Sequence, residues 1–147
     1  MYSHLLVPVD GTELSERAAQ ASLELARKLG AKLTAFVAEP MPPLPTMGSN
    51  PQVYTRDADA HLQRTEQHAR AVLAKFKAHA EEVGVEFEGK FQRTDAVDDA
   101  IVAAAHEFGC DLIVMATHGR GAFGELLFGS HTKNVMTRSK LPLLVLH

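Results

Sequence analysis

The sequence predicts a doubly wound α/β domain built on a five-stranded parallel sheet. Short continuous apolar runs, typical of strands covered on both faces, alternate with longer segments of helical periodicity. A strand, a helix and a second strand open the chain, and such a unit forms a right-handed crossover between parallel strands. With 147 residues and no internal repeat, the chain fits one domain, residues 1–147.

The first strand–helix–strand unit follows from the local pattern. Leu5–Val9 is an apolar run, and Pro8 is expected near the strand's end because it has no N–H for the ladder. Thr12 is the expected N-cap of a helix that Gly30 ends. Apolar residues keep helical spacing within it at Leu14, Ala18, Ala21, Leu25 and Leu29. Leu33–Ala38 is the second strand.

A proline-rich segment separates the second strand from a long helix. Pro40 to Pro51 holds five of the seven prolines, so we expect an irregular surface loop. Asn50 and Pro51 form an N-cap and first-turn pair for a helix that runs to about Val83. Val85–Phe91 then alternates apolar and polar residues, which is typical of an edge strand.

The C-terminal half completes the alternation. Thr94 is the expected N-cap of a third helix, which Gly109 ends. The fourth strand spans Asp111–Ala116, a helix follows over about residues 129–138, and the last strand spans Leu141–Leu146. This succession is Rossmann-like or flavodoxin-like, and the expected strand order is 3-2-1-4-5.

Composition and charge exclude several function classes. Hydrophobic residues make up 46% and charged residues 22%, and the net charge of −3 argues against binding to a nucleic-acid backbone. No apolar run approaches the roughly 18 residues of a membrane span, and the N-terminus does not resemble a signal peptide. The single cysteine, Cys110, excludes an intramolecular disulfide and suits a reducing compartment. We therefore expect a cytoplasmic protein that contacts neither nucleic acid nor membrane.

A glycine-rich stretch, residues 115–130, joins the fourth strand to the last helix. Four glycines within eleven residues let a backbone approach a ligand closely, and the N–H groups of a helix start attract anions. In a doubly wound sheet, this loop should face the turn at Asp10 across one crevice at the carboxyl ends of the strands. We therefore expect a phosphate site here, although Asp10 could instead be only a turn residue that caps the first helix.

Three known phosphate motifs do not describe this stretch. Gly119–Gly124 matches G-x-G-x-x-G, but no acidic residue follows Glu125, as the dinucleotide fingerprint would require. A P-loop needs a Gly-Lys pair before its hydroxyl residue, and none precedes Ser130. The His-x-Gly-His arrangement of nucleotidyl-transferring relatives of this fold is also absent at His118.

The spacing of this stretch resembles the universal stress protein family. Thr117–Arg120 is followed, after eight further residues, by Gly129 and Ser130. Leu5–Gly11 is similar to that family's first strand and turn, and Leu141–Val145 to its last strand. The likeness therefore spans essentially the whole chain.

The family's nucleotide-binding branch carries the motif G-x-x-G-x₉-G-[S/T]. The last three fixed positions are present as Gly119, Gly129 and Ser130, whereas Ala116 replaces the first glycine. With a negative φ at this position, the alanine adds only a methyl group near the ligand. A positive φ would cost about 1 kcal/mol or more and move the loop.

The resemblance implies ATP or a related adenine nucleotide as the ligand. The residues implied beside the base and ribose are Pro8, Val9, Asp10, Val37, Met115 and Ala116. Asp10 would be the polar anchor, and Val37 would pack on the adenine. The residues implied on the phosphate side are His118, Gly119, Arg120, Gly129, Ser130, His131 and Thr132. Mg²⁺ could bridge the phosphates with few protein ligands.

The resemblance implies a stress-response protein that binds an adenine nucleotide as a sensor or switch. The alternative is a dimeric interaction protein of the same fold that does not bind ATP. Hydrolysis needs a positioned base or nucleophile, and Ser130 has no evident base except His118 or His131. We therefore expect a binding module rather than a dedicated enzyme, with weak ATPase activity as a further alternative.

Two further expectations concern metals and assembly. His61, His68 and His79 share one helix face but lie roughly 10 and 16 Å apart along it, too far to share a metal ion. The last strand, residues 142–147, is apolar and ends the chain at an uncovered sheet edge, which favours a homodimer through this strand. Members of the family that the sequence resembles similarly pair through the final strand.

Overall fold

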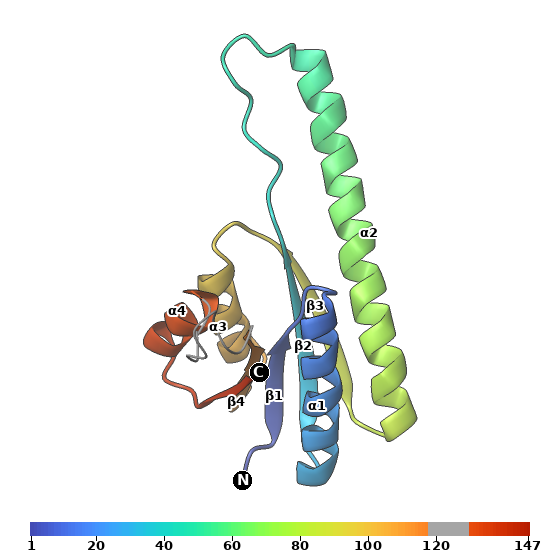
Figure 1. Ribbon diagram of the computed structural model, residues 1–147, viewed down its shortest axis with the longest axis vertical. Helices are drawn as coiled ribbons and strands as arrows, with labels where there is room; N and C mark the ends of the chain where they lie inside the picture. The colour runs from blue at the N-terminus through green and yellow to red at the C-terminus, as the bar shows by residue number, and fades with distance from the viewer. Residues whose placement is uncertain (118–129) are drawn as a thin grey trace, which may run out of the picture.

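The computed structural model describes residues 1–117 and 130–147. Five parallel strands form one sheet in the order β3-β2-β1-β4-β5, with helices on both faces (Figure 1). The strands are β1 (His4–Pro8), β2 (Lys32–Glu39), β3 (Phe87–Arg93), β4 (Leu112–Ala116) and β5 (Leu143–Leu146). The helices are α1 (Glu13–Leu29), α2 (Pro51–Val83), α3 (Val97–Glu107) and α4 (Ser130–Arg138). The predicted fold class and strand order are confirmed.

Each face of the sheet has its own apolar core. Leu5 and Val7 of β1 belong to the cluster beneath α1 and α2, whereas Leu6 belongs to the cluster beneath α3 and α4. All three are fully buried, because side chains alternate across a strand and both faces of β1 are covered. This double coverage is the reason why the first strand is a continuous apolar run.

The ends of α1 and α2 form as their sequences predict. The Thr12 hydroxyl accepts a hydrogen bond from the Ser15 N–H, and the Asn50 side chain accepts from the first turn of α2. Gly30 and Gly84 end the two helices in the left-handed conformation, at φ of 64° and 74°.

Several predicted boundaries differ from the structure, among them the start of the last strand, which is Leu143 rather than Leu141. Thr94 is not the N-cap of α3: its hydroxyl accepts the Ala96 N–H in a turn ahead of the helix, and Ala96 is the N-cap. The third strand begins at Phe87 rather than Val85, because the Val85 N–H bonds the Ala80 carbonyl and completes the end of α2.

The longest element is α2, whose 33 residues span roughly 50 Å at the α-helical rise. Its N-terminal part and residues 40–50, which contain no helix or strand, extend past the carboxyl end of the sheet (Figure 1). The Met41 N–H, which donates to the Asp95 carboxylate at 3.0 Å, attaches the start of this segment to the loop after β3. Within the described ranges, none of the helices combines the length and apolar character that crossing a membrane requires.

Candidate functional site

A cleft of about 350 Å³ opens at the carboxyl ends of β1, β2 and β4. The chain leaves β1 toward β2 on one side and reaches β4 on the other, so the cleft lies at the topological switch point, where ligands of such sheets bind. The described residues that line it are Pro8, Val9, Asp10, Thr12, Leu14, Ser15, Phe36, Ala38, Val97, Ile101, Met115, Ala116, Thr117, His131 and Thr132. The turn after β1 and the end of β4 thus face one cavity, as expected.

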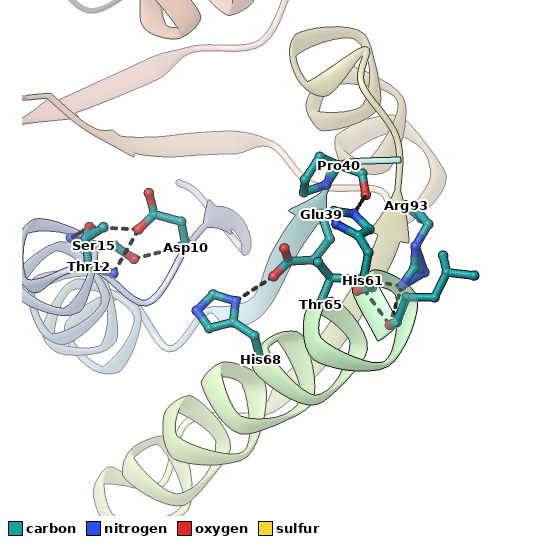
Figure 2. A network of polar contacts seen from close by, with 10 residues as sticks. Asp10, Thr12, Ser15, Glu39, Pro40, His61, Thr65, His68 and Arg93 are labelled. Atoms are coloured by element: carbon teal, nitrogen blue, oxygen red, sulfur yellow. Dashed lines mark hydrogen bonds and ion pairs between the residues drawn. The ribbon is translucent and has the colours of Figure 1, made fainter. Parts of the chain in front are cut away.

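The turn between β1 and α1 presents one carboxylate to the cleft. Asp10 Oδ1 accepts the Thr12 N–H at 3.0 Å and the Thr12 hydroxyl at 2.7 Å. The Asp10 N–H donates to the buried Ser15 Oγ at 3.0 Å, which closes the turn (Figure 2). Asp10 is exposed, and its carboxylate uses Oδ1 for its hydrogen bonds with the described residues, which leaves Oδ2 unused by that part of the chain. Asp10 is therefore a turn residue that also lines the cleft.

The floor of the cleft is apolar, and it corrects the expectation for Val37. The Val37 side chain is fully buried in the cluster beneath α1 and α2, on the opposite face of the sheet from α3. Its neighbours Phe36 and Ala38 line the cleft instead, because adjacent residues of a strand point to opposite faces. Ile101 and Met115 complete this surface. The β2 contribution is thus shifted by one residue.

Ala116 has an ordinary strand conformation. It pairs with Leu146 in the ladder between β4 and β5, and no non-glycine residue of the described chain has a positive φ. The alanine therefore carries no backbone strain, and its consequence is one methyl group on the cleft wall.

A buried carboxylate holds the start of α4 against α3. Asp98 lies in the first turn of α3. One of its carboxylate oxygens lies 2.6 Å from His131 Nδ1, and the other accepts a hydrogen bond from the Asn134 amide at 2.7 Å. His131 and Thr132 line the cleft, so the first turn of α4, whose N–H groups have no partner within the helix itself, borders the cavity. No lysine or arginine lies among the described lining residues.

The whole chain, residues 1–147, matches the family model described as the universal stress protein family. The chain belongs to this family. A universal stress protein of Thermus aquaticus is 31% identical over 99% of this chain and 98% of its own length. Among solved structures, a universal stress protein family member from Burkholderia pseudomallei is 27% identical, with a TM-score of 0.74 over 99% of this chain and 96% of its own. A universal stress protein solved in complex with cAMP is 26% identical, with a TM-score of 0.68 over 99% and 97%.

The part of the chain that the structure describes includes only some positions of the nucleotide motif of the universal stress protein family. Ala116 ends β4, and Ser130 is the exposed first residue of α4. The remaining predicted residues lie outside the described ranges: His118, Gly119, Arg120 and Gly129. Pro8, Val9, Asp10, Met115, Ala116, His131 and Thr132 all line one cleft, as predicted.

Sequence reasoning missed several residues of this universal stress protein's cleft. Phe36 and Ala38 follow from the period of two once the phase of β2 is known. Val97 and Ile101 of α3 also face the cavity, and their helical spacing is equally typical of residues that pack only in a core. Asp98 had no local signal, since its partners are 33 and 36 residues away.

The cysteine and the histidines of α2 lie away from this cleft. Burial, and secondarily the charge of Asp111, raise the pKa of the Cys110 thiol to about 11, so it is an inert core residue. His61 Nε2 lies 3.1 Å from the Pro40 carbonyl, and His68 Nδ1 lies 2.6 Å from the Glu39 carboxylate. Within residues 1–117 and 130–147, no group of three or more potential ligand side chains could hold a metal ion.

Proposed function

We propose that the protein binds ATP or a related adenine nucleotide in the switch-point cleft and acts as a stress-response sensor or switch in the cytoplasm. The observation that carries the proposal is one cavity that joins an apolar floor, the Asp10 carboxylate and a helix N-terminus. These features match a base, a ribose hydroxyl and a phosphate respectively. The 26% identical universal stress protein in complex with cAMP supports the same class of ligand.

Each part of the nucleotide has a proposed partner. The base packs between Phe36, Ala38 and Met115, and Oδ2 of Asp10 accepts a hydrogen bond from the ribose. The phosphates meet N–H groups of the first turn of α4. The motif adds further phosphate-side residues: His118, Gly119, Arg120, Gly129, Ser130, His131 and Thr132. Mg²⁺ would bridge phosphate oxygens and screen their charge.

Calorimetric titration with ATP and Mg²⁺ tests the proposal. We expect saturable binding that Asp10→Asn weakens about tenfold, because the amide keeps the Thr12 contacts through its oxygen but replaces the ribose acceptor with a donor. Glu13→Gln, a neighbouring change at an exposed residue outside the cleft wall, is the matched control. The absence of heat at millimolar nucleotide would overturn the proposal in favour of an interaction protein with no nucleotide.

Slow ATP hydrolysis is a second candidate function, favoured by the pair of Asp98 and His131. A carboxylate that accepts from Nδ1 fixes the tautomer of the ring, so that the neutral imidazole carries its lone pair on Nε2 beside the cleft, the arrangement of a general base. Turnover measured at saturating ATP that is lost in His131→Gln, Ser130→Ala and Asp10→Ala would support it. Phosphate release equal to that of a buffer blank would exclude it.

We also propose a homodimer through β5. This strand pairs only with β4 among the described strands, so it is an edge strand, and Leu144 on it is 38% exposed. Sedimentation at micromolar concentration should give a dimer, and Leu144→Glu should shift it to a monomer. A monomeric wild-type protein would refute this assembly.

A further inference from the structure

A second cavity, of about 240 Å³, lies between α1 and α2 on the far side of the β1–α1 turn. We call it the α1–α2 groove. Its apolar surface is formed mainly by Val9, Ala19, Val72 and Phe76. The described residues that line the nucleotide cleft include none from α2, so the groove is a separate site. Val9 and Ser15 line both cavities.

The polar end of the groove is a histidine held by a buried carboxylate. The Glu39 side chain is 10% exposed, and His68 Nδ1 lies 2.6 Å from it (Figure 2). An ionised carboxylate only accepts hydrogen bonds, so the contact places a proton on Nδ1, and when the ring is neutral its Nε2 is an acceptor. Nε2 abuts Gly11, since a Cβ there would lie 2.9 Å away, and it has no hydrogen-bond partner among the described residues. The groove therefore offers a fixed acceptor beside an apolar surface.

The volume limits the size of the ligand. A dry apolar cavity of about 150 Å³ holds benzene, whereas pockets for drug-sized ligands begin at about 300 Å³. The α1–α2 groove, at about 240 Å³, has room for one six-membered ring with small substituents and is smaller than the cleft of about 350 Å³ proposed for the nucleotide.

The charges around the groove favour a neutral hydroxyl over a carboxylate on that ring. Lys75, the one lysine or arginine among the described lining residues, is already paired with Glu16. A ligand carboxylate would find no unpaired lysine or arginine among these lining residues, and the Glu39 carboxylate lies behind His68. A hydroxyl, by contrast, can donate directly to Nε2.

We propose that the α1–α2 groove binds a single-ring phenol, with its hydroxyl donating to His68 Nε2 and its ring packed on Val72 and Phe76. A ligand in the groove affects the nucleotide cleft through Ser15. This residue lines both cavities, and its hydroxyl accepts the Asp10 N–H. The binding site itself does not depend on nucleotide binding.

The test is an amide NMR titration of the full chain with p-cresol, without nucleotide. We expect saturable shifts at groove residues and at the Asp10 amide, and about fivefold weaker binding of toluene, which lacks the donor. Sodium benzoate should bind more weakly than p-cresol as well. Ala71→Phe fills the groove from an exposed position of α2 and should abolish the shifts, whereas Ala78→Phe, exposed on the same helix but outside the groove, should leave them unchanged.

Three results would overturn the inference: no saturation at millimolar p-cresol, shifts that persist in Ala71→Phe, or binding of toluene or benzoate as tight as that of p-cresol. Gln20→Trp fills the groove from α1 and replaces Ala71→Phe if that variant does not give a folded spectrum. Because no nucleotide is present, failure of ATP binding and failure of this site are separate outcomes.

Discussion

Replacing Asp98 with alanine tests whether this carboxylate holds α4 in place. The side chain is 11% exposed and accepts two side-chain hydrogen bonds from α4, from His131 and Asn134. A hydrogen bond to a charged group contributes about 1.5–3 kcal/mol, and the exposure of His131, at 64%, reduces its share. We therefore expect Asp98→Ala to lower the free energy of unfolding by about 3 kcal/mol.

Asp99 supplies the matched control on the next residue of α3. It pairs with Arg138 at 2.7 Å, also on α4, but its side chain is 66% exposed, so the pair is worth at most about 1 kcal/mol. Urea unfolding of both variants measures the difference, and calorimetry should show weakened ATP binding only for Asp98→Ala. Equal losses of stability in the two variants, or a loss below about 1 kcal/mol for Asp98→Ala, would refute the role assigned to this carboxylate.

Three further predictions follow from the described contacts. Ala116→Gly should leave nucleotide affinity within about threefold and lower stability by about 1 kcal/mol, because a strand glycine gains no needed conformation and costs entropy; a large gain in affinity would contradict this. Cys110, with its pKa raised to about 11, should resist a disulfide reagent at pH 8 until urea is added. Although burial acts in the opposite direction, hydrogen bonds from Ser3 and His4 lower the pKa of Asp111. The ionised Asp111 side chain should therefore stabilise the folded protein above the pKa it has in the unfolded chain, near 4. This contribution should be lost as the pH falls through the lower pKa that Asp111 has in the folded protein. Urea unfolding at a series of pH values should show the loss in the wild type and not in Asp111→Asn.

The sheet is predictable because its elements carry strong local signals. Continuous apolar runs indicate strands buried on both faces, and Thr12, Asn50 and Gly30 place the helix ends. The switch-point rule then brings the turn at Asp10 and the end of β4 to one cleft with no knowledge of coordinates. The apolar runs and the order of strands and helices along the chain thus predict both the architecture and the location of the candidate site.

The phase of β2 is not predictable in the same way. Leu33–Ala38 carries one polar residue, Thr34, which is itself fully buried because both faces are covered, so the pattern does not show which side faces the cleft. The choice between Val37 and Phe36 is therefore made by tertiary packing. Similarly, Asp98 resembles an ordinary first-turn carboxylate, and only the approach of α4 gives it partners.

The attachment of α4 through Asp98 has a consequence for the evolution and engineering of this chain. The first turn of α4 is held to α3 by side-chain contacts of Asp98 with His131 and Asn134. We therefore expect α4 to keep its place when residues 118–129 are exchanged for segments of other sequence or length. Segments from other proteins that replace residues 118–129 should therefore change the ligand preference of the cleft without requiring changes in the hydrophobic core.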